Sequence, residues 1–161
     1  MIRHAGLIAL RLEGLWRGVL IEGASAAGKS DLALRALSRG FRLVADDRVL
    51  VFACQGRLFG RAPDPLKGLI EVRGLGVVAA PSLRYAEIVL AARCAADGDL
   101  IERLPGRGPL TLLGVAIPRF DLAPLEASAQ AKLARALEHL GAHTQQAYQA
   151  RFAAPGGRSG A

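Results

Sequence analysis

The sequence contains little cysteine, few aromatic residues and few lysines, and each shortage narrows the class of protein. Cys54 and Cys94 form neither a Cys-x-x-Cys pair nor a Cys/His cluster, which argues against a disulfide-rich domain and against a cysteine-ligated zinc site. We interpret both as reduced thiols of a cytoplasmic protein. Aromatic residues make up only 5% of the 161 residues, so the core is expected to consist of Leu, Val, Ile and Ala.

Long apolar runs and runs of like charge are also missing. No segment approaches the roughly 18 consecutive apolar residues of a membrane span, and residues 1–14 lack the apolar region and cleavage site of a signal peptide. The net charge is +7, and 18 arginines but only three lysines contribute to it. Because the arginines are scattered and are not interleaved with aromatic residues, we expect neither a nucleic-acid partner nor a membrane association.

Short apolar segments dominate what is present, and most have the length of strands. Helices are predicted only over residues 28–39 and 124–140, where apolar residues recur at helical spacing and a glycine follows. We therefore expect one α/β domain over residues 1–145, with a mixed, strand-rich sheet and few helices, and a flexible tail over residues 146–161. The predicted strands are residues 7–12, 18–23, 41–45, 49–53, 69–78 (two strands around a glycine turn), 86–94 and 110–117, and residues 55–68 are predicted as a loop or short hairpin.

The stretch GASAAGKS, residues 23–30, fits the pattern G-x-x-x-x-G-K-[ST] of a phosphate-binding loop, the P-loop. Glycines let backbone N–H groups approach a polyphosphate, and the following helix adds unpaired N–H groups and a positive dipole end. We expect Lys29 to reach the β- and γ-phosphates of ATP and the Ser30 hydroxyl to ligate Mg²⁺. The predicted ATP-binding residues are Gly23, Ala24, Ser25, Ala26, Ala27, Gly28, Lys29 and Ser30.

Two aspartates end the next predicted strand, in the stretch RLVADD. Because successive side chains of a strand point to opposite faces, Asp46 and Asp47 should differ in role unless the strand has already ended. We expect one of them to face the phosphates, where an aspartate can accept a proton from an attacking hydroxyl group or help to hold a metal. The other would cap a turn or pair with Arg48, and a solvated acidic turn is the alternative for both.

Glu71 is a further acidic candidate, in the stretch LIEVRGLG. It lies on an apolar strand just before two glycines. Together with Ser30 it could complete the oxygen ligands of Mg²⁺, a hard cation that favours carboxylates. An edge residue that forms an ion pair with Arg73 is the alternative interpretation.

These motifs, in this order and at this spacing, resemble the bacterial HPr kinase/phosphorylase family. Its members carry a nucleotide loop, then R-G-h-R-L-V-A-D-D, then E-I-R-G-L-G, and the similarity covers about residues 17–117. The resemblance implies ATP-dependent phosphorylation of a serine in HPr, the phosphocarrier protein of the sugar phosphotransferase system. It also implies the reverse attack of phosphate on phosphoserine, a fold like that of phosphoenolpyruvate carboxykinase, and a homo-oligomer, with a hexamer as the family form.

The resemblance also implies roles for single residues. Lys29 is similar to the loop lysine, and Ser30 and Glu71 are similar to the magnesium ligands, with Asp46 beside them as a third metal-site residue. Asp47 falls on the general base, which acts as an acid in the reverse reaction. Arg103, in IERLPG, is similar to the family's catalytic arginine.

The chain departs from the family pattern at several positions. Ala26 stands where members usually have a glycine, and His4, in RHAG, is the candidate for a catalytic histidine although about four extra residues separate it from the loop. A terminal histidine without function is the alternative for His4. Residues 117–133 replace the stretch that longer members use for dephosphorylation, and Asp121 and Glu126 there are either site residues or acids at the start of a helix.

Two other functions fit the same motifs. A P-loop kinase for a small hydroxyl metabolite would use the same loop and base, and a nucleotide-binding regulator would use the loop without phosphoryl transfer. Phosphorylation of HPr is the hypothesis that the additional signatures favour.

Overall fold

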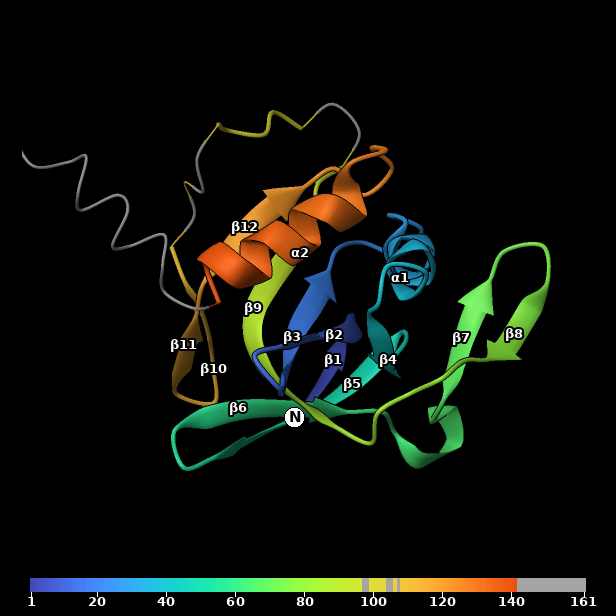
Figure 1. The fold of residues 1–161 in the computed structure, drawn as a ribbon, viewed down its shortest axis with the longest axis horizontal. Helices are drawn as coiled ribbons and strands as arrows, with labels where there is room; N and C mark the ends of the chain where they lie inside the picture. The colour runs from blue at the N-terminus through green and yellow to red at the C-terminus, as the bar shows by residue number, and fades with distance from the viewer. Residues whose placement is uncertain (97–98, 104–105, 107, 142–161) are drawn as a thin grey trace, which may run out of the picture.

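The computed structural model describes residues 1–96, 99–103, 106 and 108–141 as a strand-rich α/β fold (Figure 1). Within these residues one eight-stranded mixed sheet, two two-stranded sheets and two α-helices are present, which confirms the predicted class. The predicted tail, residues 146–161, and the domain boundary at residue 145 lie outside the described residues. The elements are β1 (Ile2–His4), β2 (Gly6–Leu12), β3 (Leu15–Glu22), α1 (Lys29–Leu37), β4 (Arg42–Ala45), β5 (Arg48–Cys54), β6 (Arg57–Arg61), the 3-10 helix η1 (Asp64–Leu66), β7 (Leu69–Val72), β8 (Gly76–Ala79), β9 (Ala86–Cys94), β10 (Leu110–Leu112), β11 (Val115–Ile117), β12 (Arg119–Leu122) and α2 (Ala129–His139).

Strand β9 is the centre of the main sheet. The strand order is β1-β5-β6-β9-β3-β2-β4, and β12 pairs with β9 outside this path. Strand β9 runs parallel to β3 and β12 and antiparallel to β6. The carboxyl ends of the three parallel strands therefore meet at one edge, and the P-loop begins there because it directly follows β3.

Two apolar cores lie on the two faces of this sheet. In β2 the side chains alternate, with Leu7 and Ala9 in one core and Ile8 in the other. The core that contains Ile8 also contains the buried residues of α1 and α2. These two helices cover that face of the sheet (Figure 1). A register shift opposite Gly18 and Val19 leaves Val89 as an extra residue in β9, so the alternation changes phase there.

Three tight turns connect hairpin strands by the same local geometry. Glu13, Gln55 and Leu113 have φ angles of 49°, 50° and 49°, and each is followed by a glycine with positive φ. Two successive residues with positive φ define the turn that matches the twist of two-residue hairpins. Residues 110–117 therefore form the β10–β11 hairpin, and the prediction of one strand there was wrong. Residues 55–68 contain β6 and η1.

Strands β1 and β12 were not predicted, and helix α2 starts later than expected. Turns occupy residues 123–128, so the helix begins at Ala129, with Leu133 and Leu137 buried as its pattern predicts. Strands β7 and β8 form a separate hairpin that projects from one side of the molecule (Figure 1). Among the described residues, no helix has the length and apolar character needed to cross a bilayer.

Candidate functional site

The P-loop leaves the carboxyl end of β3 and ends at the first turn of α1. Gly23 has a φ of 153°, and a Cβ placed on it would lie 2.9 Å from Cβ of Cys94. Gly28, the N-cap residue of α1, has a φ of 96°, which favours glycine. Both glycines of the motif are thus required by the backbone.

Lys29 is buried inside the loop. Its side chain folds back, and Nζ donates hydrogen bonds to the carbonyl oxygens of Gly23 at 2.9 Å and Ala24 at 2.7 Å. Only 8% of the residue is exposed. The ammonium group therefore lies within the curve of the loop, at the position where a phosphate-binding cation is needed.

Ala26 adopts a conformation that suits glycine better. Its φ is 61°, in the left-handed region. A side chain there costs about 1–2 kcal/mol. The glycine that the family pattern places at this position would relieve this strain, so the departure noted in the sequence makes the loop stiffer.

Asp46 joins three parts of the site through a buried carboxylate. Oδ1 accepts a hydrogen bond from the Ser30 hydroxyl at 2.8 Å, and Oδ2 accepts one from the backbone N–H of Glu71 at 2.9 Å. Only 6% of Asp46 is exposed. The carboxylate therefore fixes the first turn of α1 and the β7–β8 hairpin beside each other.

Asp47 has the opposite environment. Strand β4 ends at Ala45, and the backbone N–H of Arg48 donates to the carbonyl oxygen of Asp46 at 2.7 Å, which closes a three-residue γ-turn around Asp47. The φ of Asp47 is 64°, and its side chain is 53% exposed. Strain of this kind costs about 1–3 kcal/mol and gathers at functional sites.

His4 connects Asp47 with the P-loop. Nδ1 of His4 lies 3.1 Å from Oδ1 of Asp47, and Nε2 lies 3.4 Å from the Ser25 hydroxyl oxygen. His4 is placed by β1, which pairs with β5, so it is not a frayed terminal residue.

The predicted metal residues come together only in part. Ser30 and Asp46 are in contact, whereas the side chain of Glu71 is exposed and its contact with Asp46 is made by the backbone. Among the described residues, no group of three or more His, Cys, Asp and Glu side chains is arranged to hold a metal.

Three further candidates have other surroundings. Arg103 is exposed and has no hydrogen bond or ion pair with another described residue. Asp121 accepts hydrogen bonds from Arg93 at 2.9 and 3.1 Å, and Glu126 pairs with Lys132. The structure does not bring these three to the cluster of Lys29, Ser30, Asp46, Asp47 and His4.

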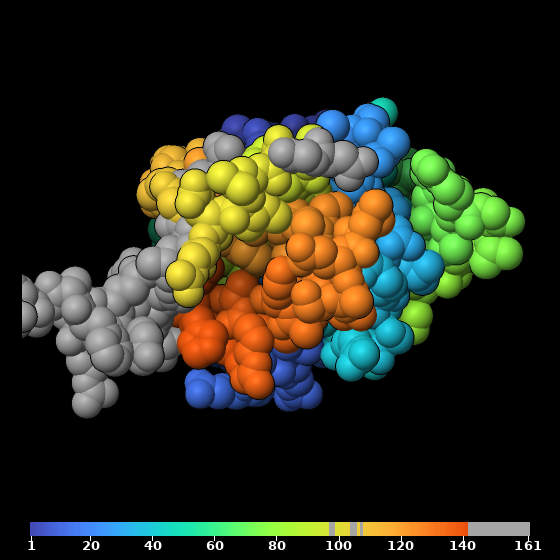
Figure 2. Space-filling model, turned by 90° about the horizontal axis from the view of Figure 1, so that it is seen from above, coloured from blue at the N-terminus to red at the C-terminus, as the bar shows by residue number. Residues whose placement is uncertain are grey.

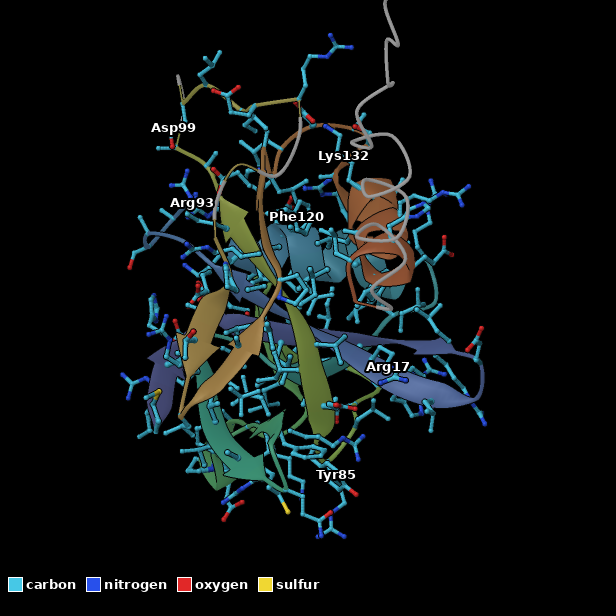
Figure 3. The ribbon with its side chains drawn as sticks, turned by 90° about the vertical axis from the view of Figure 1, so that its left-hand side faces the viewer. Arg17, Tyr85, Arg93, Asp99, Phe120 and Lys132 are labelled. Atoms are coloured by element: carbon cyan, nitrogen blue, oxygen red, sulfur yellow. The ribbon has the colours of Figure 1, made fainter. Side chains whose placement is uncertain are left out.

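Two arginines near this edge escaped the sequence reasoning. Arg93, the penultimate residue of β9, forms ion pairs with Asp99 and Asp121, and Figure 3 shows Arg93 near Asp99. The hydrogen bond to Asp121 is the main cause that raises the pKa of Arg93. Arg35, on α1, contacts residues 124–130. The spacing of Asp31 and Arg35 was a signal for a helical ion pair, but no local pattern shows contacts with such a distant segment.

Comparison with known proteins adds several likenesses. The curated HPr kinase/phosphorylase of Clostridium tetani is 50% identical over 73 residues, which are 45% of this chain and 24% of the relative. That of Streptococcus equi subsp. zooepidemicus is 39% identical over 116 residues, 65% of this chain and 37% of the relative. The chain thus matches about a quarter to a little over a third of the length of these relatives.

A solved structure supports the fold over nearly the whole chain. The Hpr(Ser) kinase/phosphatase from Coxiella burnetii superposes with a TM-score of 0.73, covering 94% of this chain and 96% of that one, at 21% identity. The family model of the HPr Serine kinase C-terminal domain matches residues 4–92, a span that includes the P-loop, both aspartates and Glu71. Since this match covers more than half of the sequence, the chain belongs to the HPr Serine kinase C-terminal domain family.

Proposed function

We propose that the chain is an ATP-dependent protein-serine kinase whose substrate is HPr or a related phosphocarrier protein. The observation that carries the proposal is the different placement of the two aspartates. Asp46 is buried against Ser30 at the P-loop helix, whereas Asp47 is exposed and linked to the P-loop through His4. One carboxylate is thus available to organise the nucleotide site and the other to meet a hydroxyl group from outside.

The P-loop would bind the triphosphate of ATP. Lys29 would exchange its hydrogen bonds with the loop carbonyls for phosphate oxygens, and the N-terminal N–H groups of α1 would bind the same anion. The phosphoenolpyruvate carboxykinase-like arrangement implied by the sequence motifs is part of this proposal. Gly23 and Gly28 keep the backbone close enough for these contacts.

The residues present also fit a magnesium ion. A hydroxyl and a carboxylate in contact, Ser30 and Asp46, are hard oxygen donors, and Mg²⁺ usually takes one or two protein oxygens together with phosphates and water. The backbone N–H of Glu71 contacts Asp46, and the carboxylate of Glu71 would contribute a further oxygen ligand. When bound, the ion neutralises charge on the phosphates.

Asp47 would act as the general base. In the forward direction the serine oxygen bonds to the γ-phosphorus, the bond to the ADP oxygen breaks, and Asp47 accepts the serine proton. In the reverse direction a phosphate oxygen attacks phosphoserine, Asp47 returns the proton to the serine oxygen, and pyrophosphate leaves. His4, 3.1 Å from Asp47, would orient the carboxylate in both directions.

The wider setting remains part of the proposal. We expect a cytoplasmic enzyme that acts in the regulation of the phosphotransferase system, without nucleic acid or membrane partners. We expect it to form a homo-oligomer, such as the family's hexamer. Arg103 stays a predicted catalytic residue although it makes no contact with the described site. Its position in the nucleotide-bound enzyme would test that role.

One assay tests the proposal directly. The purified chain is incubated with ATP, Mg²⁺ and HPr from the same organism, and intact-mass spectrometry should detect a single serine phosphate, which added phosphate should then remove with release of pyrophosphate. Lys29→Ala should abolish both nucleotide binding and transfer. ATP consumption with a small metabolite but no phosphorylated HPr would favour the metabolite kinase, and nucleotide binding without any transfer would favour the regulator.

A further inference from the structure

A segment distant in sequence lies directly against the P-loop. Residues 123–128, the bridging segment, connect β12 with α2, and in Figure 2 this orange part of the chain packs beside the blue start of α1. A Cβ placed on Gly28 would lie 3.2 Å from Cδ2 of Leu125 and 3.6 Å from Cγ of Pro124. The bridging segment therefore forms one wall beside the N-terminus of α1.

Arg35 holds the bridging segment in this position. Its guanidinium donates hydrogen bonds to the carbonyl oxygens of Pro124 and, at 3.3 Å, of Glu126. It also donates to Oε1 of Gln130 at 3.0 Å and to Oδ2 of Asp31 at 2.9 Å. The planar guanidinium thus joins α1 to the bridging segment and the start of α2, about 90 residues later in the sequence. A lysine ammonium cannot reproduce this arrangement of several N–H donors in one plane.

The hydrogen bonds of Arg35 to Pro124 and Glu126 fix the position of Leu125, which lies between these two residues. Leu125 is 69% exposed, although its side chain lies beside Gly28, where an added Cβ would come within 3.2 Å of it. An apolar side chain in that place adds nothing to the binding of phosphate, which is bound by N–H groups and the Lys29 ammonium. It offers a surface for the ribose and base instead.

We propose that Arg35 is a positioning residue for nucleotide binding, and that it holds Leu125 as an apolar wall for the nucleoside part of the ligand. This inference rests on the nucleotide-binding function proposed above. It adds a contact that distinguishes a nucleotide from a bare polyphosphate, and it assigns that contact to a segment outside the P-loop.

The affinities for two ligands distinguish the contribution of Leu125 from that of the phosphate site. Calorimetry measures the affinity for the non-hydrolysable ATP analogue AMP-PNP and for pyrophosphate, both with Mg²⁺. Leu125→Ala should weaken AMP-PNP binding about fivefold, the effect expected from losing part of one leucine contact, and leave pyrophosphate binding and the thermal midpoint unchanged. Arg35→Ala should weaken AMP-PNP at least as much, and Arg35→Lys should restore only part of the loss.

Matched controls exclude a general effect of surface substitution. Leu15→Ala removes a similarly exposed leucine, 54%, at the opposite end of β3. Arg39→Ala removes an exposed arginine just after α1 whose side chain makes no hydrogen bond or ion pair with another described residue. Both should bind both ligands as the unmodified protein does. In the kinase assay, Leu125→Ala should raise KM for ATP and leave kcat unchanged.

Three results would overturn the inference. Unchanged AMP-PNP affinity in Leu125→Ala would show that no wall exists, and an equal loss for AMP-PNP and pyrophosphate would move the effect to the phosphate site. Arg35→Ala with a lower thermal midpoint but normal AMP-PNP affinity would reduce Arg35 to a structural role. If the unmodified protein binds neither ligand, the proposed function itself fails, and that failure is distinct from the other three.

Discussion

The two ends of β9 use similar residues for different purposes. At its amino end, Glu87 receives hydrogen bonds from Arg57 and Arg17, and its side chain is only 15% exposed. At its carboxyl end the sheet meets the P-loop, and nearby Asp47 is 53% exposed, with His4 at 3.1 Å and Arg48 at 3.7 Å. Figure 3 places Tyr85, which precedes the amino end, and Asp99, which follows the carboxyl end, on opposite sides of the molecule.

Pairing and backbone strain, more than residue type, distinguish the two ends. Glu87 belongs to a regular strand, and its carboxylate is matched by two guanidinium groups. Asp47 lies in a γ-turn with positive φ and keeps much of its carboxylate open to solvent. A matched acid in regular backbone contributes to the fold, whereas an exposed acid on strained backbone next to a ligand loop is available for chemistry.

The largest effect should come from exchanging the two acids for their amides. Asp47→Asn removes the proposed base, so phosphoryl transfer to HPr should fall by about 10²-fold or more while AMP-PNP affinity is kept. Glu87→Gln, the control at the other end, should transfer phosphate at the normal rate. Initial rates measured by mass spectrometry decide the comparison, and similar rates for both variants would remove Asp47 from the mechanism.

A substitution in the core near the amino end of β9 should lower stability and leave nucleotide binding unchanged. A Cβ on Gly60 would lie 2.5 Å from Cδ2 of Leu7, 2.9 Å from Cγ1 of Val49 and 3.1 Å from Cδ1 of Ile88. Gly60→Ala should therefore lower the free energy of unfolding by about 1–3 kcal/mol, measured by urea denaturation, with AMP-PNP affinity unchanged.

Gly108→Ala is the matched control for this prediction. A Cβ on Gly108 would meet no atom of the described residues within 4 Å, so Gly108→Ala should keep the stability of the unmodified protein. A normal midpoint for Gly60→Ala would mean that the core around β6 adapts without cost.

Several strands were predictable because they depend on local patterns. Alternation, strand length and flanking turn residues located β2, β3 and β9. The hairpin at residues 110–117 was missed because Leu113 adopts positive φ without the Asn or Asp that usually announces such a turn. The strand β12 was missed because its four residues, RFDL, directly follow a proline, and their polar/apolar alternation is too short to indicate a strand.

The sequence could not predict which of the candidate site residues lie together. The alternation rule suggested different roles for Asp46 and Asp47, yet only the structure shows the γ-turn centred on Asp47 and the buried contact of Asp46 with Ser30. His4 could not be placed, because its position depends on the pairing of β1 with β5. Arg35 acts on a segment some 90 residues away, a distance that no local pattern spans.

A smaller effect is expected at the amino end of β9, where the stability that Glu87 contributes should decrease at acidic pH. The hydrogen bond from Arg57 is the main cause that lowers the pKa of Glu87 below its ordinary value of 4.5, partly offset by burial. This stabilisation is therefore present above pH 4.5 and is lost as the pH falls through that value towards the lower pKa of the folded state. Urea denaturation between pH 3 and 7 should show the stability difference between the unmodified protein and Glu87→Gln shrinking below about pH 4.5, and a constant difference would contradict it.

The smallest effect concerns the reactivity of the two thiols, Cys94 at the carboxyl end of β9 and Cys54 at the end of β5. Cys94, at the carboxyl end of β9, is buried beneath Gly23, and burial raises its pKa to about 11, so that at pH 8 about one thiol in a thousand is ionised. Cys54, at the end of β5, is exposed. Iodoacetamide at pH 8 should therefore label Cys54 first, with both sites labelled in urea. Because labelling of Cys94 requires the strand end under the P-loop to open, AMP-PNP with Mg²⁺ should slow it further and leave Cys54 unaffected; equal rates at both thiols would show that this end of β9 is no better protected than the other.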